Sequence, residues 1–151
     1  MKKQLIFAIS VLFIFFSCEK TESNPTDESK LVIKAGFICG WGSGEDSIEI
    51  SRTSIKYVYY IPGKSLQPQF RKTRAVSSSE WTEIMNDVNM DNFLKLNYQT
   101  CKVCADGCDE WIFIQKDNIS HGIRFGKGAK IDSISQLQVK LEQLRTEFNA
   151  K

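Results

Sequence analysis

Cysteine spacing most constrains how this chain of 151 residues can fold, because covalent cross-links fix which segments must meet. Cys101, Cys104 and Cys108 fall within eight residues of the stretch CKVCADGCDEW, and Cys39 lies far upstream. A fifth cysteine, Cys18, ends an apolar run near the amino terminus. Whether the four downstream cysteines form disulfides, a metal site or a redox pair depends on the compartment in which the chain folds.

The amino terminus predicts export. Lys2 and Lys3 precede an apolar run from Leu5 to Phe16 that only Ser10 interrupts. As a helix, such a run spans about 18 Å, which is less than the roughly 30 Å of hydrocarbon in a bilayer. This length and the charged start are typical of a secretory signal peptide and not of a membrane-spanning helix.

The residues that end the run resemble the lipobox of bacterial lipoprotein precursors, since the small residue Ser17 precedes Cys18. The resemblance implies a signal peptide over residues 1–17, acylation of Cys18 with palmitate-type chains, and a lipid anchor in the outer membrane, facing the periplasm or the cell surface. Residues 18–30 lack large apolar side chains and predict a disordered, lipidated tether. Residues 31–151 have the length of a single domain, which resembles small uncharacterised lipoprotein domains of bacteria.

Charge and composition narrow the expected partners. Loss of Lys2 and Lys3 with the signal peptide takes the formal net charge from +2 to 0, so no long-range field favours nucleic acid. We expect contact with the membrane through the lipid on Cys18, and an unidentified protein or glycan as ligand. We expect a monomer with no cofactor.

The domain sequence predicts an α+β fold. Two amphipathic helices are expected, over residues 77–88 and 132–148, each opened by a capping box: Ser77 with Glu80, and Ser133 with Gln136. Five strands are expected over residues 47–51, 54–61, 69–76, 110–115 and 119–125. The order is therefore three strands, a helix, two strands and a helix. Short connections predict an antiparallel sheet of about five strands with both helices packed on one face.

In an oxidising compartment, four cysteines predict two disulfides. Of the three pairings we favour Cys39–Cys104 with Cys101–Cys108, because a Cys101–Cys104 bond would close the tightest ring. An all-cysteine zinc site would normally combine two close pairs, and a thioredoxin-like dithiol would stand at the start of a helix. Calcium is a further hypothesis, on Asp106, Asp109 and Glu110, but their spacing is not that of an EF-hand loop. We predict no metal site.

No catalytic set is marked in the sequence. His121 is the single histidine, and no nucleophile is placed as its partner, so a hydrogen-bonded structural role is favoured. We therefore predict a non-enzymatic binding or envelope-associated module. Candidate partner contacts are Trp41, in the glycine-rich loop CGWGSGED, and the strand residues Tyr57 and Tyr59. The alternative is a small hydrolase, thiol-redox protein or zinc protein that uses His121 or the Cys101–Cys108 cluster.

Overall fold

The computed structural model describes residues 30–40, 44–61 and 68–148. The predicted signal peptide, most of the predicted tether and Cys18 lie outside these residues. In chain order the elements are β1 (Leu31–Cys39), β2 (Glu45–Ile50), β3 (Ser54–Tyr60), β4 (Phe70–Ala75), α1 (Ser78–Asn86), α2 (Met90–Phe93), η3 (Lys102–Ala105), β5 (Cys108–Lys116), β6 (Ile119–Gly126), η4 (Asp132–Ile134) and α3 (Ser135–Thr146), where η denotes a short 3-10 helix.

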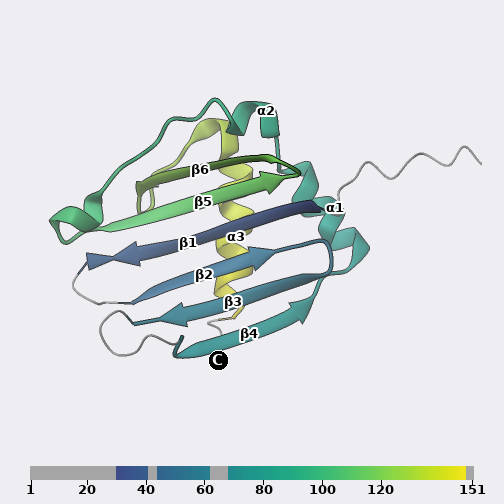
Figure 1. The fold of residues 1–151 in the computed structure, drawn as a ribbon, viewed down its shortest axis with the longest axis horizontal. Coiled ribbons are helices and arrows are strands. Elements are labelled where there is room, and N and C mark those ends of the chain that lie inside the picture. The colour runs from purple at the N-terminus through teal and green to yellow at the C-terminus, as the bar shows by residue number, and fades with distance from the viewer. Residues whose placement is uncertain (1–29, 41–43, 62–67, 149–151) are drawn as a thin grey trace, which may run out of the picture.

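The strands form one antiparallel sheet of six strands in the order β4-β3-β2-β1-β5-β6 (Figure 1). The α+β class and the antiparallel pairing are confirmed, and all five predicted strands are present. The predicted order was wrong at its start, because β1 is an additional strand at the centre of the sheet. Its two faces both carry apolar residues, so it lacks the alternation of polar and apolar residues that is typical of a half-buried strand.

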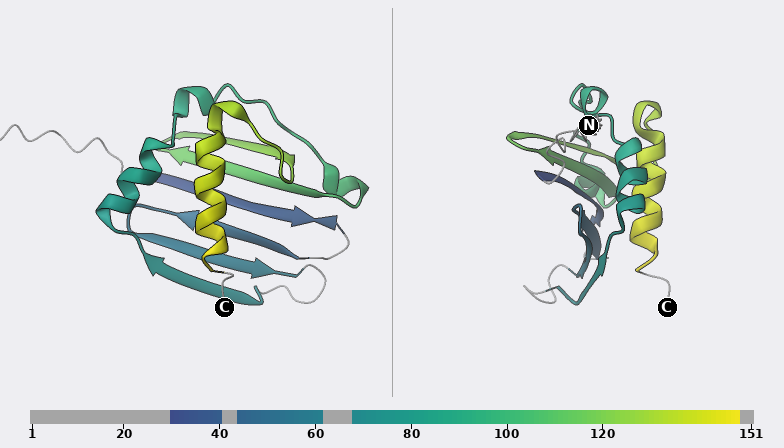
Figure 2. Two further views of the ribbon diagram at one scale, coloured as in Figure 1. Left: turned by 180° about the vertical axis from the view of Figure 1, so that it is seen from behind. Right: turned by 90° about the vertical axis from the view of Figure 1, so that its right-hand side faces the viewer.

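The two longer helices lie on the same side of the sheet, and α3 runs across the strands (Figure 2). From β1, Leu31, Ile33 and Ala35 are buried beneath them. Trp81 of α1 and Leu141 of α3 are buried on the opposite side of this interface. Removal of these apolar side chains from water is the main stabilising contribution to the two-layer arrangement.

The opposite face of the sheet is not covered by a helix in the described ranges (Figure 2). Charged side chains cross it: Glu49 of β2 lies between Lys34 of β1, at 3.1 Å, and Lys56 of β3, at 2.9 Å. These cations are the reason that the pKa of Glu49 is lowered. Among residues 30–40, 44–61 and 68–148, no helix has both the length and the apolar character that crossing a bilayer requires.

Candidate functional site

A cavity of about 310 Å³ lies between α3, the sheet and the segment that joins β6 to η4. Ala35, Ile112 and Phe125 form an apolar floor on the sheet, and Leu141 lines the side formed by α3. The volume is in the range of small-molecule sites, which begins at roughly 300 Å³. The cavity is therefore the candidate binding site of this domain.

A small residue in the sheet creates the space. Ala35 lies between Ile48 of β2 and Ile112 of β5, and Ile112 in turn lies opposite Ile123 of β6. Each neighbour in this cross-strand row is a branched side chain, and only Ala35 stops at Cβ. Interiors pack closely wherever side chains can meet, so the shortened position leaves a space under α3.

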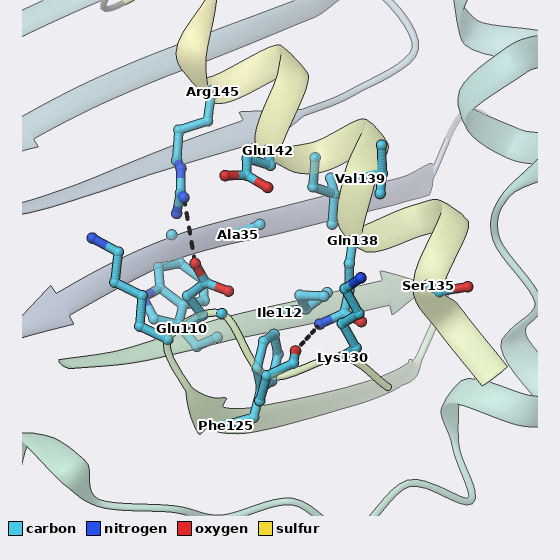
Figure 3. A pocket seen from close by; sticks show the side chains of 16 residues that line it. Ala35, Glu110, Ile112, Phe125, Lys130, Ser135, Gln138, Val139, Glu142 and Arg145 are labelled. Carbon is cyan, nitrogen blue, oxygen red and sulfur yellow. Dashed lines mark hydrogen bonds and ion pairs between the residues drawn. The ribbon is translucent and has the colours of Figure 1, made fainter. Parts of the chain in front are cut away.

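Charged residues close one end of the cavity. On β1, Phe37 lies opposite Asp46 of β2 and Glu110 of β5. Arg145 of α3 covers Phe37, with its guanidinium carbon 5.1 Å from the centre of the ring. Its Nε lies 3.5 Å from Oδ1 of Asp46 and its Nη2 lies 3.6 Å from Oε1 of Glu110. Figure 3 shows Arg145 pointing from the helix toward Glu110 at the cavity.

These charges are compensated locally. The side chains of Asp46 and Arg145 expose only 3% and 11% of their surface, and that of Glu110 exposes 20%. A second cation, Lys127, places its Nζ 4.4 Å from the centre of the Phe37 ring. Two carboxylates thus face two cations around one aromatic ring. Such pairing is needed because an isolated buried charge would be strongly destabilising.

The guanidinium of Arg145 retains unused donors. Within the described residues, no hydrogen bond from its N–H groups is formed, although the whole residue is only 9% exposed. Arg145 therefore presents donors at the end of an apolar cavity, beside the acceptor oxygens of Glu110.

The remaining wall is a loop held by one side chain of α3. Oε1 of Gln138 accepts the N–H of Ile131 at 2.8 Å, and its Nε2 donates to the carbonyl of Ala129 at 2.9 Å (Figure 3). The loop turns at Gly128, whose φ of 78° favours glycine. These contacts fix the loop beside the cavity, where the exposed side chain of Lys130 stands at the mouth.

All four predicted disulfide cysteines are paired, but the expected pairing was wrong. The bonds are Cys39–Cys108 and Cys101–Cys104. The register of β1 with β5 places Cys39 directly opposite Cys108, with 4.1 Å between their Cα atoms. Because β1 was not recognised as a strand, this register was not foreseen. The tight ring that seemed unfavourable is accommodated by the 3-10 turn η3, with 5.3 Å between the Cα atoms.

The carboxylate of Asp109 is engaged in hydrogen bonds with its own loop. Its carboxylate is fully buried and accepts hydrogen bonds from Oγ1 of Thr100 at 2.8 Å and from the N–H groups of Lys102 and Val103, both at 3.1 Å. Burial opposes ionisation of Asp109, but these three hydrogen bonds, with the charge of Arg124, hold its pKa below the ordinary value. The residue therefore anchors the Cys101–Cys104 turn to the sheet.

The other predicted site residues are not brought together. His121 is bonded through Nε2 to the carbonyl of Leu96 at 2.8 Å and meets the ring of Phe93 edge-on. Within residues 30–40, 44–61 and 68–148, no three His, Cys, Asp or Glu side chains are grouped to hold a metal ion. The exposed Asp106 and the half-buried Glu110 are thus separate from any such group.

The expected partner contacts have different outcomes. Tyr57 is only 1% exposed, stacks on Phe148 at 5.2 Å and donates a hydrogen bond of 3.4 Å to Asp46, so it is a core residue and not a surface contact. Tyr59 is half-buried and packs against the same core. Trp41 lies outside the described residues.

Apart from Glu110, sequence reasoning missed the cavity, although two signals were present. In α3, Leu137, Leu141 and Arg145 follow one another at four-residue steps, so the arginine occupies the apolar stripe. In β2, Asp46 lies on the same buried face as Ile48 and Ile50, because every second residue of a strand points to one side. A cation and an anion at inward positions must find partners, and this requirement could have indicated their pairing.

No protein-family model matches this chain, and no curated protein sequence matches it. The candidate site therefore rests on its own geometry.

Proposed function

We propose that this chain is an exported, lipid-anchored lipoprotein whose disulfide-linked domain is a non-enzymatic binding module. Its binding site is the cavity under α3, and its ligand is a small molecule with an apolar body. The cavity itself is the observation that carries this proposal. Acylation at Cys18 would hold the domain at the outer membrane. The domain would act as a monomer and would not bind nucleic acid.

The two disulfides support export. Bonds of this kind persist in oxidising compartments and are rare in the cytosol. They join β1 to β5 and close the η3 turn, so they stiffen the end of the sheet next to the charged row around Phe37. A preorganised scaffold lowers the ordering cost of ligand binding. The disulfides thus help to preorganise the sheet that forms the binding cavity.

The geometry favours binding over catalysis. The floor formed by Ala35, Ile112 and Phe125 would contact the apolar body of the ligand. These three side chains carry no polar group that could attack the ligand. His121 is engaged with a main-chain carbonyl. The competing hypothesis, an enzyme built on His121 or on the Cys101–Cys108 cluster, predicts turnover of a generic ester, glycoside or peptide that is lost in His121→Ala.

The test fills the cavity and leaves the surface unchanged. Full-length lipidated protein in lipid nanodiscs is titrated with the fluorescent apolar probe N-phenyl-1-naphthylamine. Ala35→Leu adds three side-chain carbons at the floor, and we expect about a tenfold or greater loss of affinity because the new side chain occupies the surface on which the probe packs. Nanodiscs without protein report how much probe enters the lipid alone.

Ala75→Leu is the matched control, because Ala75 is exposed on β4 and does not line the cavity. It should bind as the unmodified protein does. Equal binding by the unmodified protein and Ala35→Leu would contradict the proposed site. The intact mass of the same preparation, with and without reductant, reports the acyl chains on Cys18 and the number of disulfides.

A further inference from the structure

We propose that the cavity selects a ligand with a neutral amide head group, which accepts from Arg145 and donates to Glu110. This inference rests on the proposed function, since it names the chemistry of the ligand that the cavity takes. It starts from the end of the cavity, where a cation with unused donors and a carboxylate stand side by side.

Charge balance argues against a charged head group. Arg145 and Lys127 contribute two positive charges around Phe37, and Asp46 and Glu110 contribute two negative charges. The other charged lining residues, Lys130 and Glu142, add one charge of each sign. An anionic head near Arg145 would also meet the carboxylate of Glu110, which lines the cavity beside it. A cationic head near Glu110 would also meet both cations. A neutral head disturbs neither pair, and a charge buried without a partner is strongly destabilising.

Hydrogen-bond complementarity then selects an amide. Within the described part of the chain, no guanidinium N–H group of Arg145 is engaged in a hydrogen bond, and the Glu110 carboxylate makes only the ion pair at 3.6 Å. An amide has an acceptor oxygen and a donor nitrogen on neighbouring atoms. It can satisfy the guanidinium and the carboxylate together while keeping its own charge at zero.

The apolar lining sets the orientation. Beyond the charged end, the ligand meets Ala35, Ile112, Phe125 and Leu141, which offer no hydrogen bonds through their side chains. An alkyl chain is excluded from water there, and its amide remains at the polar end. The ligand class is thus a small aliphatic amide, bound chain-first against the floor and with its head at Arg145.

Three probes with one chain length test this assignment: octanamide, octanoate and octylamine. Each is used to displace N-phenyl-1-naphthylamine from the full-length protein in nanodiscs, with Ala35→Leu nanodiscs subtracted. Octanamide should displace the dye at a concentration about tenfold lower than either charged probe, because only the charged probes meet uncompensated like charge.

Two variants should shift the selectivity in opposite directions. Glu110→Gln keeps the shape but leaves the site one charge more positive, so octanoate should gain about tenfold relative to octanamide. Lys127→Gln leaves it one charge more negative, so octylamine should gain instead. Glu83→Gln, an equal change of charge on α1, is the matched control because Glu83 does not line the cavity. A purely structural role for Glu110 would not shift the preference from octanamide toward octanoate.

The outcomes separate the two proposals. Tighter binding of octanoate or octylamine by the unmodified protein, or equal binding of all three, overturns the amide head while the cavity remains the site. Absence of any displacement that depends on Ala35 overturns the proposed function and this inference with it. Should Glu110→Gln fail to fold by circular dichroism, the exposed Lys127 still supplies a decisive variant.

Discussion

At the scale of single residues, Asp109 links the cysteine loop to the sheet. Replacing its carboxylate in Asp109→Asn leaves the N–H groups of Lys102 and Val103 with at most one good acceptor. We expect the free energy of unfolding at pH 7 to fall by about 1–3 kcal/mol, measured by urea denaturation. Asp106→Asn is the control, since Asp106 is exposed and its left-handed conformation suits asparagine equally well.

The same residue predicts a pH dependence. The pKa of Asp109 is lowered in the folded protein, so ionisation stabilises the fold fully above the ordinary value of about 4. This contribution is lost as the pH falls through the lowered pKa of the folded state. The difference between the unmodified protein and Asp109→Asn should therefore be constant from pH 7 to about pH 4 and shrink below it. A difference that does not change with pH would contradict the assignment.

The cysteines show which features of the site can be predicted from the sequence and which cannot. The four cysteines could be identified as disulfide-forming from their number and the predicted compartment. Their pairing depended on a register, Cys39 opposite Cys108, that exists only in the assembled sheet. The role of Arg145 likewise depended on residues of three strands that meet only after folding.

The N-terminus of α1 is stabilised by a hydrogen bond in its first turn. Oγ of Ser77 accepts the N–H of Glu80 at 3.2 Å, as the sequence predicts. Ser77→Ala should lower the free energy of unfolding by about 1 kcal/mol, measured by chemical denaturation, because this N–H loses its acceptor. Ser78→Ala is the control, since no hydrogen bond of the Ser78 side chain is found among the described residues. Equal effects of the two variants would show that the cap is not the cause.

The expected caps also show where local patterns reach their limit. The carboxylate of Glu80 interacts with the backbone N–H of Ser77, as the box predicts, and also binds Arg74 of β4 at 2.7 and 2.8 Å. The predicted box of Ser133 and Gln136 is absent, and α3 begins after the 3-10 turn η4, with Ile134 as its first flanking residue. Local patterns located both helices and the cap of α1, but they did not predict the 3-10 turn that precedes α3.

At the scale of the whole molecule, the two disulfides should differ in their effect on stability. Cys39–Cys108 has a sequence separation of 69, whereas Cys101–Cys104 has a separation of 3. The chain-entropy relation gives about 4 kcal/mol for the long loop and about 2 kcal/mol for the short one. Unfolding of the serine pairs Cys39→Ser/Cys108→Ser and Cys101→Ser/Cys104→Ser, compared under one set of conditions, should show this ranking. A larger loss of unfolding free energy in Cys101→Ser/Cys104→Ser than in Cys39→Ser/Cys108→Ser would contradict the chain-entropy explanation.

The central place of β1 has a consequence for biogenesis. The earliest strand of the sheet gains β2 as a neighbour within a few residues, but its other neighbour, β5, begins only at Cys108. A nascent chain that ends before Cys108 leaves one edge of β1 without a partner strand. The unpaired N–H and C=O groups of this edge can pair with another chain, which leads to aggregation. We therefore expect an incomplete chain that lacks β5 to aggregate more readily than the full-length chain.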